Sequence, residues 1–194
     1  MQKRTLGKTG INVSVLGLGT APAAFLKTES KRFGDLLNQL LDAGLNLIDT
    51  AARYPDSEKT LGRLIAHRRN EFTLVSKCGQ AEEGLTGAAW SAGIIAETID
   101  RSLKSLGTDR IDVMLLHSCD LATLKTGEAL GALVKARQQG KVKHIGYSGD
   151  NEAAAYAVTL KEVEVLETSV NVVDQINLDK VLPGAQKNNV GVIA

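Results

Sequence analysis

The residues of this chain best suited to chemistry are an acid, a tyrosine, a lysine and a histidine at the ends of apolar segments. Asp49 lies near the end of the segment 45–50, and Tyr54 follows five residues after it. Lys77 and His117 end two later apolar segments, 72–77 and 111–117. A free phenol titrates at about pH 10, which makes it a weak proton donor at neutral pH. A lysine ammonium beside the phenol would lower this pKa, and a carboxylate bonded to the lysine would keep the ammonium charged and in place.

The histidine completes a site that could act on a carbonyl group. With Tyr54 as the general acid, His117 could hydrogen-bond the same carbonyl oxygen, orient the substrate and support the developing charge. Such a site needs a hydride donor, and among common cofactors this indicates a nicotinamide. Taken singly, the four residues could be a capping acid, a packed tyrosine, a surface lysine and a core histidine. It is their combination that indicates a catalytic site.

The elements that must position these residues alternate regularly along the chain. Apolar segments typical of strands occur at 15–20, 45–50, 72–77, 111–117, 142–148, 163–171 and 190–194. Amphipathic helix patterns occur at 29–43, 57–68, 92–106, 127–139, 152–160 and 179–187. Strands that are apolar on both faces, each followed by a helix, are typical of a parallel sheet covered by helices.

Two α/β folds fit this alternation, a doubly wound open sheet and a barrel. A dinucleotide-binding open sheet should carry GxGxxG after its first strand, whereas this chain reads GLGTAP there. We therefore predict a parallel (β/α)8 TIM barrel, preceded by a β-hairpin over residues 4–13 and forming a single domain over 1–194. The sequence stops within the seventh strand, so we expect a C-terminally incomplete barrel from a longer protein. If the 194 residues were the whole protein, we would expect weak cofactor binding and little activity.

In a parallel barrel, functional residues come from the C-terminal ends of the strands and the loops that follow. Besides the four residues above, these positions carry Gly19, Thr20, Ser148, Glu167 and Asn171. Consecutive apolar strands that each end in a hydrogen-bonding or titratable side chain are difficult to explain by packing alone. The pattern therefore predicts a binding site at this end of the barrel.

Composition argues against several other classes of protein. The net charge is +1 and basic residues are spread along the chain, so there is no basic stripe for nucleic acid, and 4% aromatic residues offer little for base stacking. No segment has the length of a signal peptide or a membrane span, so we expect a cytoplasmic protein. Cys78 and Cys119 are expected to be free thiols. The histidines share no ligand spacing with cysteine or acid, so we expect no metal site.

The motifs also resemble those of the aldo-keto reductases. GLNLIDTAARY and SEKTLGRLI, then LVSKCG, LGTDRIDVMLLH and GKVKHIGYSG, occur in that family's order and spacing. The resemblance implies that Tyr54 is the proton donor, that Asp49 and Lys77 tune it, and that His117 orients an aldehyde or ketone reduced by NADPH. It also implies that the hairpin closes the bottom of the barrel. The cofactor-binding positions it implies are Gly19, Thr20, Asp49, Ser148, Gly149, Glu167 and Asn171.

Two positions depart from the family's pattern, and two other functions stay open. The family often has Ser-Asn after its fifth strand to hold the nicotinamide carboxamide, whereas here Ser148 is followed by Gly149 and Asp150. Its sixth strand often offers glutamine, and this chain has Glu167. Alternatively, Lys77 could form a Schiff base with a carbonyl substrate, or the barrel could be a non-catalytic nucleotide-binding regulatory subunit. We expect a small carbonyl substrate, a monomer, and no nucleic-acid or membrane partner.

Overall fold

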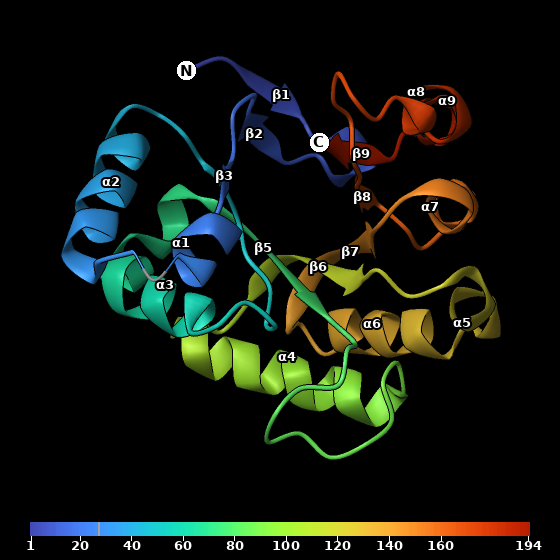
Figure 1. The fold of residues 1–194 in the computed structure, drawn as a ribbon, viewed down its shortest axis with the longest axis horizontal. Coiled ribbons are helices and arrows are strands. Elements are labelled where there is room, and N and C mark those ends of the chain that lie inside the picture. The colour runs from blue at the N-terminus through green and yellow to red at the C-terminus, as the bar shows by residue number, and fades with distance from the viewer. Residues whose placement is uncertain (27) are drawn as a thin grey trace.

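Seven parallel strands form one curled sheet in the computed structural model, which describes residues 1–26 and 28–194 (Figure 1). Each strand pairs with the next one along the chain, as a barrel requires. The strands are β3 (Leu18–Gly19), β4 (Leu47–Asp49), β5 (Thr73–Cys78), β6 (Ile111–His117), β7 (Val142–Ser148), β8 (Val165–Glu167) and β9 (Gly191–Ile193). This arrangement confirms the predicted α/β fold, as a parallel sheet of seven strands that curls into part of a barrel.

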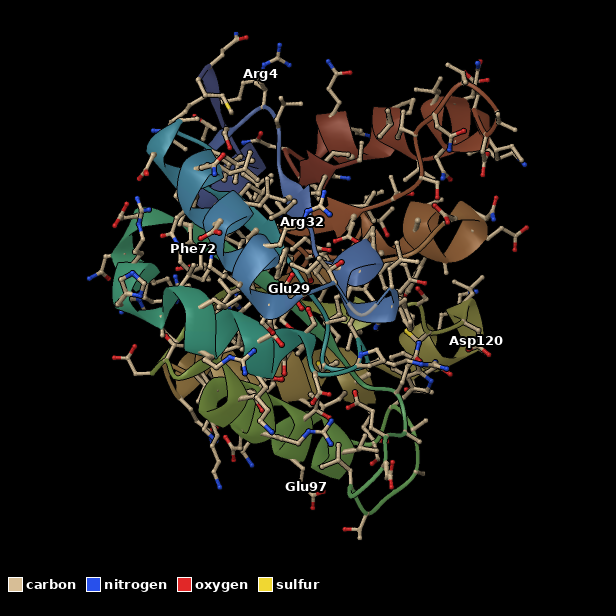
Figure 2. All side chains as sticks on the ribbon, turned by 60° about the vertical axis from the view of Figure 1, so that its left-hand side comes forward. Arg4, Glu29, Arg32, Phe72, Glu97 and Asp120 are labelled. Atoms are coloured by element: carbon tan, nitrogen blue, oxygen red, sulfur yellow. The ribbon has the colours of Figure 1, made fainter. Side chains whose placement is uncertain are left out.

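Helices cover the outer face of the sheet (Figure 1). They are α1 (Ala21–Phe25), α2 (Ser30–Asp42), α3 (Ser57–Ile65), α4 (Ala92–Leu106), α5 (Leu121–Thr126), α6 (Glu128–Gln138), α7 (Asn151–Ala157), α8 (Ile176–Lys180) and α9 (Leu182–Lys187). The apolar faces of these helices and of the strands form the larger core. Charged side chains such as Glu97 and Asp120 lie at the periphery (Figure 2).

Several predicted boundaries were wrong. The predicted helix 179–187 is two helices, α8 and α9, because Pro183 starts a new helix in its first turn. The predicted helix 57–68 ends at Ile65 and continues as the 3₁₀ segment η2 (Ala66–Glu71), in which Arg68 has non-helical dihedral angles. The predicted strand 163–171 pairs only over β8, since the chain turns away after Glu167.

The N-terminal hairpin packs against the apolar interior of the curled sheet. Its strands are β1 (Lys3–Thr5) and β2 (Asn12–Ser14), joined through the 3₁₀ turn η1 (Gly7–Thr9). Leu6 and Val13 join a second core of inward-facing strand residues, namely Leu47, Val75, Val113, Leu115 and Val165. The backbone N–H of Lys8 donates a hydrogen bond of 2.7 Å to the carbonyl oxygen of Asn189, just before β9. The hairpin therefore closes the interior at the expected end.

Strands β3 and β9 are the two edges of the sheet in the described part of the chain. Apolar side chains beside these edges are partly open to solvent: Val192 is 37% exposed and Val15 is 45% exposed. The described sheet is thus open between its first and last strands.

Candidate active site

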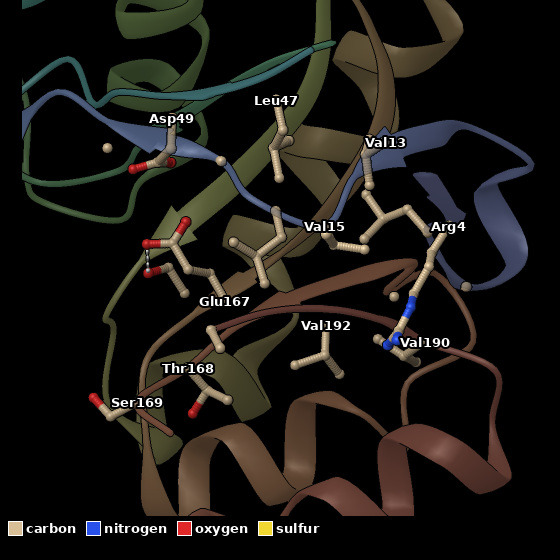
Figure 3. A pocket seen from close by; sticks show the side chains of 18 of the residues that line it. Arg4, Val13, Val15, Leu47, Asp49, Glu167, Thr168, Ser169, Val190 and Val192 are labelled. Carbon is tan, nitrogen blue, oxygen red and sulfur yellow. Dashed lines mark hydrogen bonds between the residues drawn. The ribbon is translucent and has the colours of Figure 1, made fainter. Parts of the chain in front are cut away.

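The C-terminal ends of the strands open into a cavity of about 790 Å³. Among the predicted site residues, its lining includes Gly19, Asp49, Ser148, Gly149 and Glu167. From this end the cavity continues between β3 and β9 toward the hairpin. Figure 3 shows the carboxylates of Asp49 and Glu167 at one end of the cavity and Arg4 at the other. The candidate site is the end that carries the two carboxylates.

Lys77 is the centre of the site. Its side chain is 1% exposed, and its Nζ atom lies 2.6 Å from Asp49 Oδ1 and 3.1 Å from Glu167 Oε1. Nζ also donates a hydrogen bond of 3.1 Å to the carbonyl oxygen of Thr50. Burial lowers the pKa of Lys77, but the charges of Asp49 and Glu167 outweigh burial and raise it above the ordinary value. The ammonium is therefore charged at neutral pH.

Tyr54 lies on the loop after β4, beside Lys77 and His117. Lys77 Nζ is 5.4 Å from the centre of the Tyr54 ring, and the rings of Tyr54 and His117 meet edge to face with centres 5.9 Å apart. Burial raises the pKa of Tyr54 above its ordinary value, while the charge of Lys77 acts in the opposite direction. The sequence predicted that Lys77 lowers the pKa of Tyr54. This net lowering is not found, because burial and the charges of Asp49 and Glu167 raise the same pKa. Tyr54 keeps its proton at neutral pH.

Asp49 pairs with Lys77 and also lies close to a second acid, Glu167. Burial and the charge of Glu167 raise the pKa of Asp49 to about 7, against the opposing charge of Lys77. Close carboxylates repel each other when both are ionised, so a proton is held more tightly by the pair. Asp49 and Glu167 therefore compete for the single positive charge of Lys77.

His117 is neutral under ordinary conditions. Burial, followed by the charges of Lys77 and Arg53, lowers the pKa of His117 to about 4. Its backbone carbonyl oxygen accepts a hydrogen bond of 2.8 Å from Gln80 Nε2, which fixes the end of β6. A neutral imidazole can donate one hydrogen bond to a substrate oxygen. The structure thus brings four residues together, namely Asp49, Tyr54, Lys77 and His117. Of these four, Asp49 lines the cavity.

Glu167 and Ser148 lie at the wall of the cavity. Ser148 Oγ donates a hydrogen bond of 3.5 Å to Glu167 Oε1, the oxygen that also contacts Lys77. The other oxygen, Oε2, is buried and has no hydrogen-bond partner in the described part of the chain. The Glu167 carboxyl is also close enough to Asp49 for the two acids to share a hydrogen bond, which helps to raise the pKa of Asp49.

Two predicted cofactor residues have their side chains elsewhere. Thr20 is fully buried, and its Oγ1 atom accepts a hydrogen bond of 2.8 Å from Ser57 Oγ, which in turn accepts one of 2.9 Å from Thr50 Oγ1. Asn171 is exposed, and its Oδ1 atom accepts hydrogen bonds of 2.9 Å from the backbone N–H groups of Val173 and Asp174. Neither residue lines the cavity. Their side chains hold the protein's own loops.

Asp150 is a residue of the site whose role the sequence did not reveal. It lines the cavity, and its Oδ1 atom accepts hydrogen bonds of 2.8 Å from Thr168 Oγ1, Ser169 N–H and Asn177 Nδ2. Burial opposes ionisation, but these hydrogen bonds outweigh it and lower the pKa of Asp150. The sequence showed only that an acid follows Gly149. The structure shows that this acid fixes the loop after β8.

Phe25 also belongs to the surroundings of the site. It ends α1, a helix that the sequence analysis missed, and its ring meets that of Tyr54 edge to face with centres 5.8 Å apart. The Phe25 side chain is 60% exposed. Five residues are too few to show a helical period, so no sequence signal placed this ring near Tyr54.

Two further observations concern other kinds of site. Among residues 1–26 and 28–194, no three or more histidine, cysteine, aspartate or glutamate side chains cluster as metal ligands would. Within the same ranges, no helix has the length and apolar character to cross a membrane.

Comparison with known proteins identifies the relatives of this chain. The family model for the aldo/keto reductase family matches residues 15–194. L-galactose dehydrogenase of Arabidopsis thaliana is 30% identical over 158 residues, which cover 77% of this chain and 49% of that protein. The uncharacterized oxidoreductase YqkF of Bacillus subtilis is 28% identical over 204 residues, covering 100% of this chain and 64% of that protein. The chain therefore spans about half to two thirds of the length of these relatives.

A solved structure shows the same arrangement of elements. The holo form of the aldo-keto reductase AKR11C1 from Bacillus halodurans superposes with a TM-score of 0.87 at 26% sequence identity. The superposition covers 100% of this chain and 65% of that one. The likeness extends over the hairpin, the curled sheet and the helices described above.

Proposed function

Because the chain belongs to the aldo/keto reductase family, we propose that the protein reduces an aldehyde or ketone to an alcohol with NADPH, using Tyr54 as the general acid. Family membership supports nicotinamide-dependent oxidoreduction of carbonyl compounds in general. The choice of NADP and the role of Tyr54 are part of the proposal. The observation that carries the proposal is the buried lysine, paired with Asp49 at 2.6 Å, beside the Tyr54 ring and next to the cavity.

The protein's own residues divide the proposed reaction between them. When bound, the reduced nicotinamide supplies the hydride for the carbonyl carbon. Tyr54 donates its phenolic proton to the carbonyl oxygen, and Lys77 stabilises the phenolate that remains. Asp49 holds the Lys77 ammonium in position. His117, as a neutral imidazole, donates a hydrogen bond to the same oxygen and so fixes the substrate's orientation.

The cofactor fits the lining of the cavity at the strand ends. Ser148 and Glu167, which are hydrogen-bonded to each other, line it with polar groups. Gly19 leaves open space, since an added Cβ there would meet no atom within 4 Å. We assign the nicotinamide end to Gly19, Asp49, Ser148, Gly149 and Glu167. Thr20 and Asn171 would support the cofactor only through the loops that they hold.

Schiff-base chemistry at Lys77 has less support. A lysine nucleophile must be uncharged, and such lysines usually have a lowered pKa. Here two carboxylates raise the pKa of Lys77. No feature of the described residues favours a regulatory barrel over an enzyme. A small carbonyl substrate, a monomeric state and a cytoplasmic location stay predictions from the sequence.

The test is a turnover assay of the purified protein. NADPH and NADH are each incubated with a panel of aliphatic and aromatic aldehydes and ketones, and nucleotide oxidation is followed together with the alcohol product by mass spectrometry. We expect alcohol formation that matches nucleotide oxidation one to one, with NADPH preferred. Binding of nucleotide without turnover on any carbonyl would favour the regulatory alternative and contradict the proposal.

A further inference from the structure

A chain of three buried hydroxyl groups joins the two ends of the loop that carries Tyr54. Thr50 directly follows β4 and Ser57 begins α3, so this loop lies between them. Thr50 Oγ1 donates a hydrogen bond of 2.9 Å to Ser57 Oγ, which donates one of 2.8 Å to Thr20 Oγ1. Thr20 and Thr50 are fully buried, and Ser57 is 4% exposed. Hydroxyl groups are costly to bury without partners, and here they serve as partners for one another.

Ser57 also bonds the loop through its backbone. Its N–H group donates a hydrogen bond of 3.1 Å to the carbonyl oxygen of Tyr54, and the Tyr54 N–H group donates one of 3.0 Å to the carbonyl oxygen of Ala51. Between Tyr54 and Ser57, Asp56 has a φ of 50°, a left-handed conformation that is uncommon for residues other than glycine. Such a conformation persists where the surrounding contacts hold it. Ser57 therefore fixes the end of the loop by one backbone and two side-chain hydrogen bonds.

Thr50 connects the hydroxyl chain to Lys77. The carbonyl oxygen of Thr50 accepts a hydrogen bond of 3.1 Å from Lys77 Nζ, while its hydroxyl donates to Ser57. The N–H group of Thr50 donates one of 2.9 Å to the carbonyl oxygen of Val75, on the neighbouring strand β5. Thr50 thus contacts the ammonium on one side and, through Ser57, the backbone of Tyr54 on the other. The distance of 5.4 Å between Lys77 Nζ and the centre of the Tyr54 ring depends on these contacts.

We propose that Thr50 and Ser57 are positioning residues whose hydroxyl groups set the place of Tyr54 relative to Lys77. The inference rests on the proposed function, in which Tyr54 donates the proton. Neither hydroxyl-bearing residue lines the cavity at the strand ends, so each acts through the loop and not on a ligand. A catalytic group displaced by about 1 Å can lose about a hundredfold in rate. Loosening the loop therefore lowers kcat and leaves binding nearly unchanged.

The experiment removes one hydroxyl group at a time. Thr50→Val replaces a hydroxyl by a methyl group of similar size and keeps the carbonyl oxygen that Lys77 contacts. We expect kcat to fall about tenfold, with the KM for the carbonyl substrate and the Kd for nucleotide nearly unchanged. Thr50→Ser keeps the hydroxyl and should keep most of kcat. Ser57→Ala should act like Thr50→Val, and the two changes together should lower kcat no further than one alone, because they break the same contact.

A matched control lies on helix α4. Thr98 is also fully buried, and its Oγ1 atom donates a hydrogen bond of 2.7 Å to the carbonyl oxygen of Ile94 in its own helix. Thr98→Val makes the same chemical change as Thr50→Val and should leave kcat at the wild-type value, even where both variants lose stability. Hydrogen exchange gives a readout besides activity. The amides of Tyr54 and Ser57 should be protected in the wild-type protein and exchange faster in Thr50→Val, but not in Thr98→Val.

Several outcomes would overturn the inference. Wild-type kcat in folded Thr50→Val, a loss that appears in KM alone, or an equal loss of kcat in Thr50→Ser would show that the hydroxyl group does not place the proton donor. If Thr50→Val does not fold, Ser57→Ala decides by its effects on kcat and KM. Whatever the variants do, wild-type Tyr54 and Ser57 amides that exchange as in an unfolded peptide would contradict the inference.

These outcomes differ from a failure of the proposed function. If the wild-type protein reduces carbonyl compounds and Tyr54→Phe lowers kcat, the proposed function stands whatever Thr50→Val does. Absence of turnover in the wild-type protein, or full turnover in Tyr54→Phe, would instead remove Tyr54 as the proton donor, and this inference with it.

Discussion

Glu167 and Lys77 form an ion pair of 3.1 Å although their strands, β8 and β5, lie three positions apart in the sheet. In a flat sheet, strands three positions apart would be separated by about 14 Å. The pair can form because the sheet curls and both side chains point to its interior. The curvature of the sheet thus creates the charge arrangement of the site, and the predictions below test its parts.

Replacing Tyr54 by phenylalanine should remove the proton donor and leave the rest of the site in place. Tyr54→Phe should lower kcat by about a hundredfold to ten-thousandfold, the usual contribution of a general acid. Nucleotide affinity should change little, since Tyr54 does not line the cavity. Steady-state kinetics and calorimetry measure the two effects. Tyr156→Phe, on helix α7, is the matched control, and full turnover in Tyr54→Phe would disprove the mechanism.

Replacing Lys77 by methionine should leave two partly buried carboxylates without a counter-charge. Loss of one partner of a buried ion pair costs about 3 to 5 kcal/mol. The cost should be largest at neutral pH and smaller in acid, because Asp49, whose pKa is raised to about 7 in the folded protein, then takes up a proton and loses its charge. Urea unfolding at both pH values measures the difference. Lys31→Met, which breaks an exposed pair with Asp35, should change stability by less than about 0.5 kcal/mol. If Lys77→Met lowered the free energy of unfolding equally at both pH values, this account would be contradicted.

His117 should make the protein less stable in acid. Its pKa falls from 6.5 to about 4 on folding, so between these values the unfolded state binds a proton that the folded state does not. Stability should therefore fall as the pH is lowered from 6.5 toward 4, by less than about 1.4 kcal/mol per pH unit from this residue. His117→Gln should flatten the pH dependence of the free energy of unfolding. Equal slopes in both proteins would show that His117 titrates normally.

Asp150 should control the order of the loop after β8. Asp150→Ala removes the acceptor for Thr168, Ser169 and Asn177, and we expect a loss of about 2 kcal/mol. Hydrogen exchange should become faster over residues 168–177. Asp120→Ala is a suitable control, since within residues 1–26 and 28–194 Asp120 accepts only from Thr123 at the start of α5. Its loss should cost about 1 kcal/mol without affecting that loop. Unchanged exchange in Asp150→Ala would rule out the assigned role.

The larger elements of the fold could be predicted from the sequence, and the short ones could not. Helix α4 has the predicted bounds, because its apolar period is long and Ser91 and Gly107 mark its ends. Helices α1 and α5 have five and six residues, which is too short for a recognisable period. Strand β8 was predicted too long, because β-branched Thr168 and Val170 after Glu167 resemble a strand although the chain turns there.

For the candidate site, the sequence indicated which residues gather but not how their charges balance. Asp49, Tyr54, Lys77 and His117 meet as expected, since parallel strands bring their C-terminal ends to one side of the sheet. The contact of Lys77 with Glu167 depends on the curvature of the sheet, which no local pattern reveals. The net effect on the pKa of Tyr54 depends on burial, and this too requires the structure. The catalytic and cofactor roles of these residues stay predictions.

The contact between the hairpin and β9 has a consequence for how this chain folds. An added Cβ on Gly7 would come within 2.1 Å of the Gly191 backbone nitrogen, so the two segments pack backbone to backbone across almost the whole sequence. Contacts between residues this far apart form late, because a long loop must close first. During synthesis, the hairpin can therefore complete its contact with this edge of the sheet only after β9 has been made. We expect its amides to gain protection in the last phase of refolding, after those of β5 and β6.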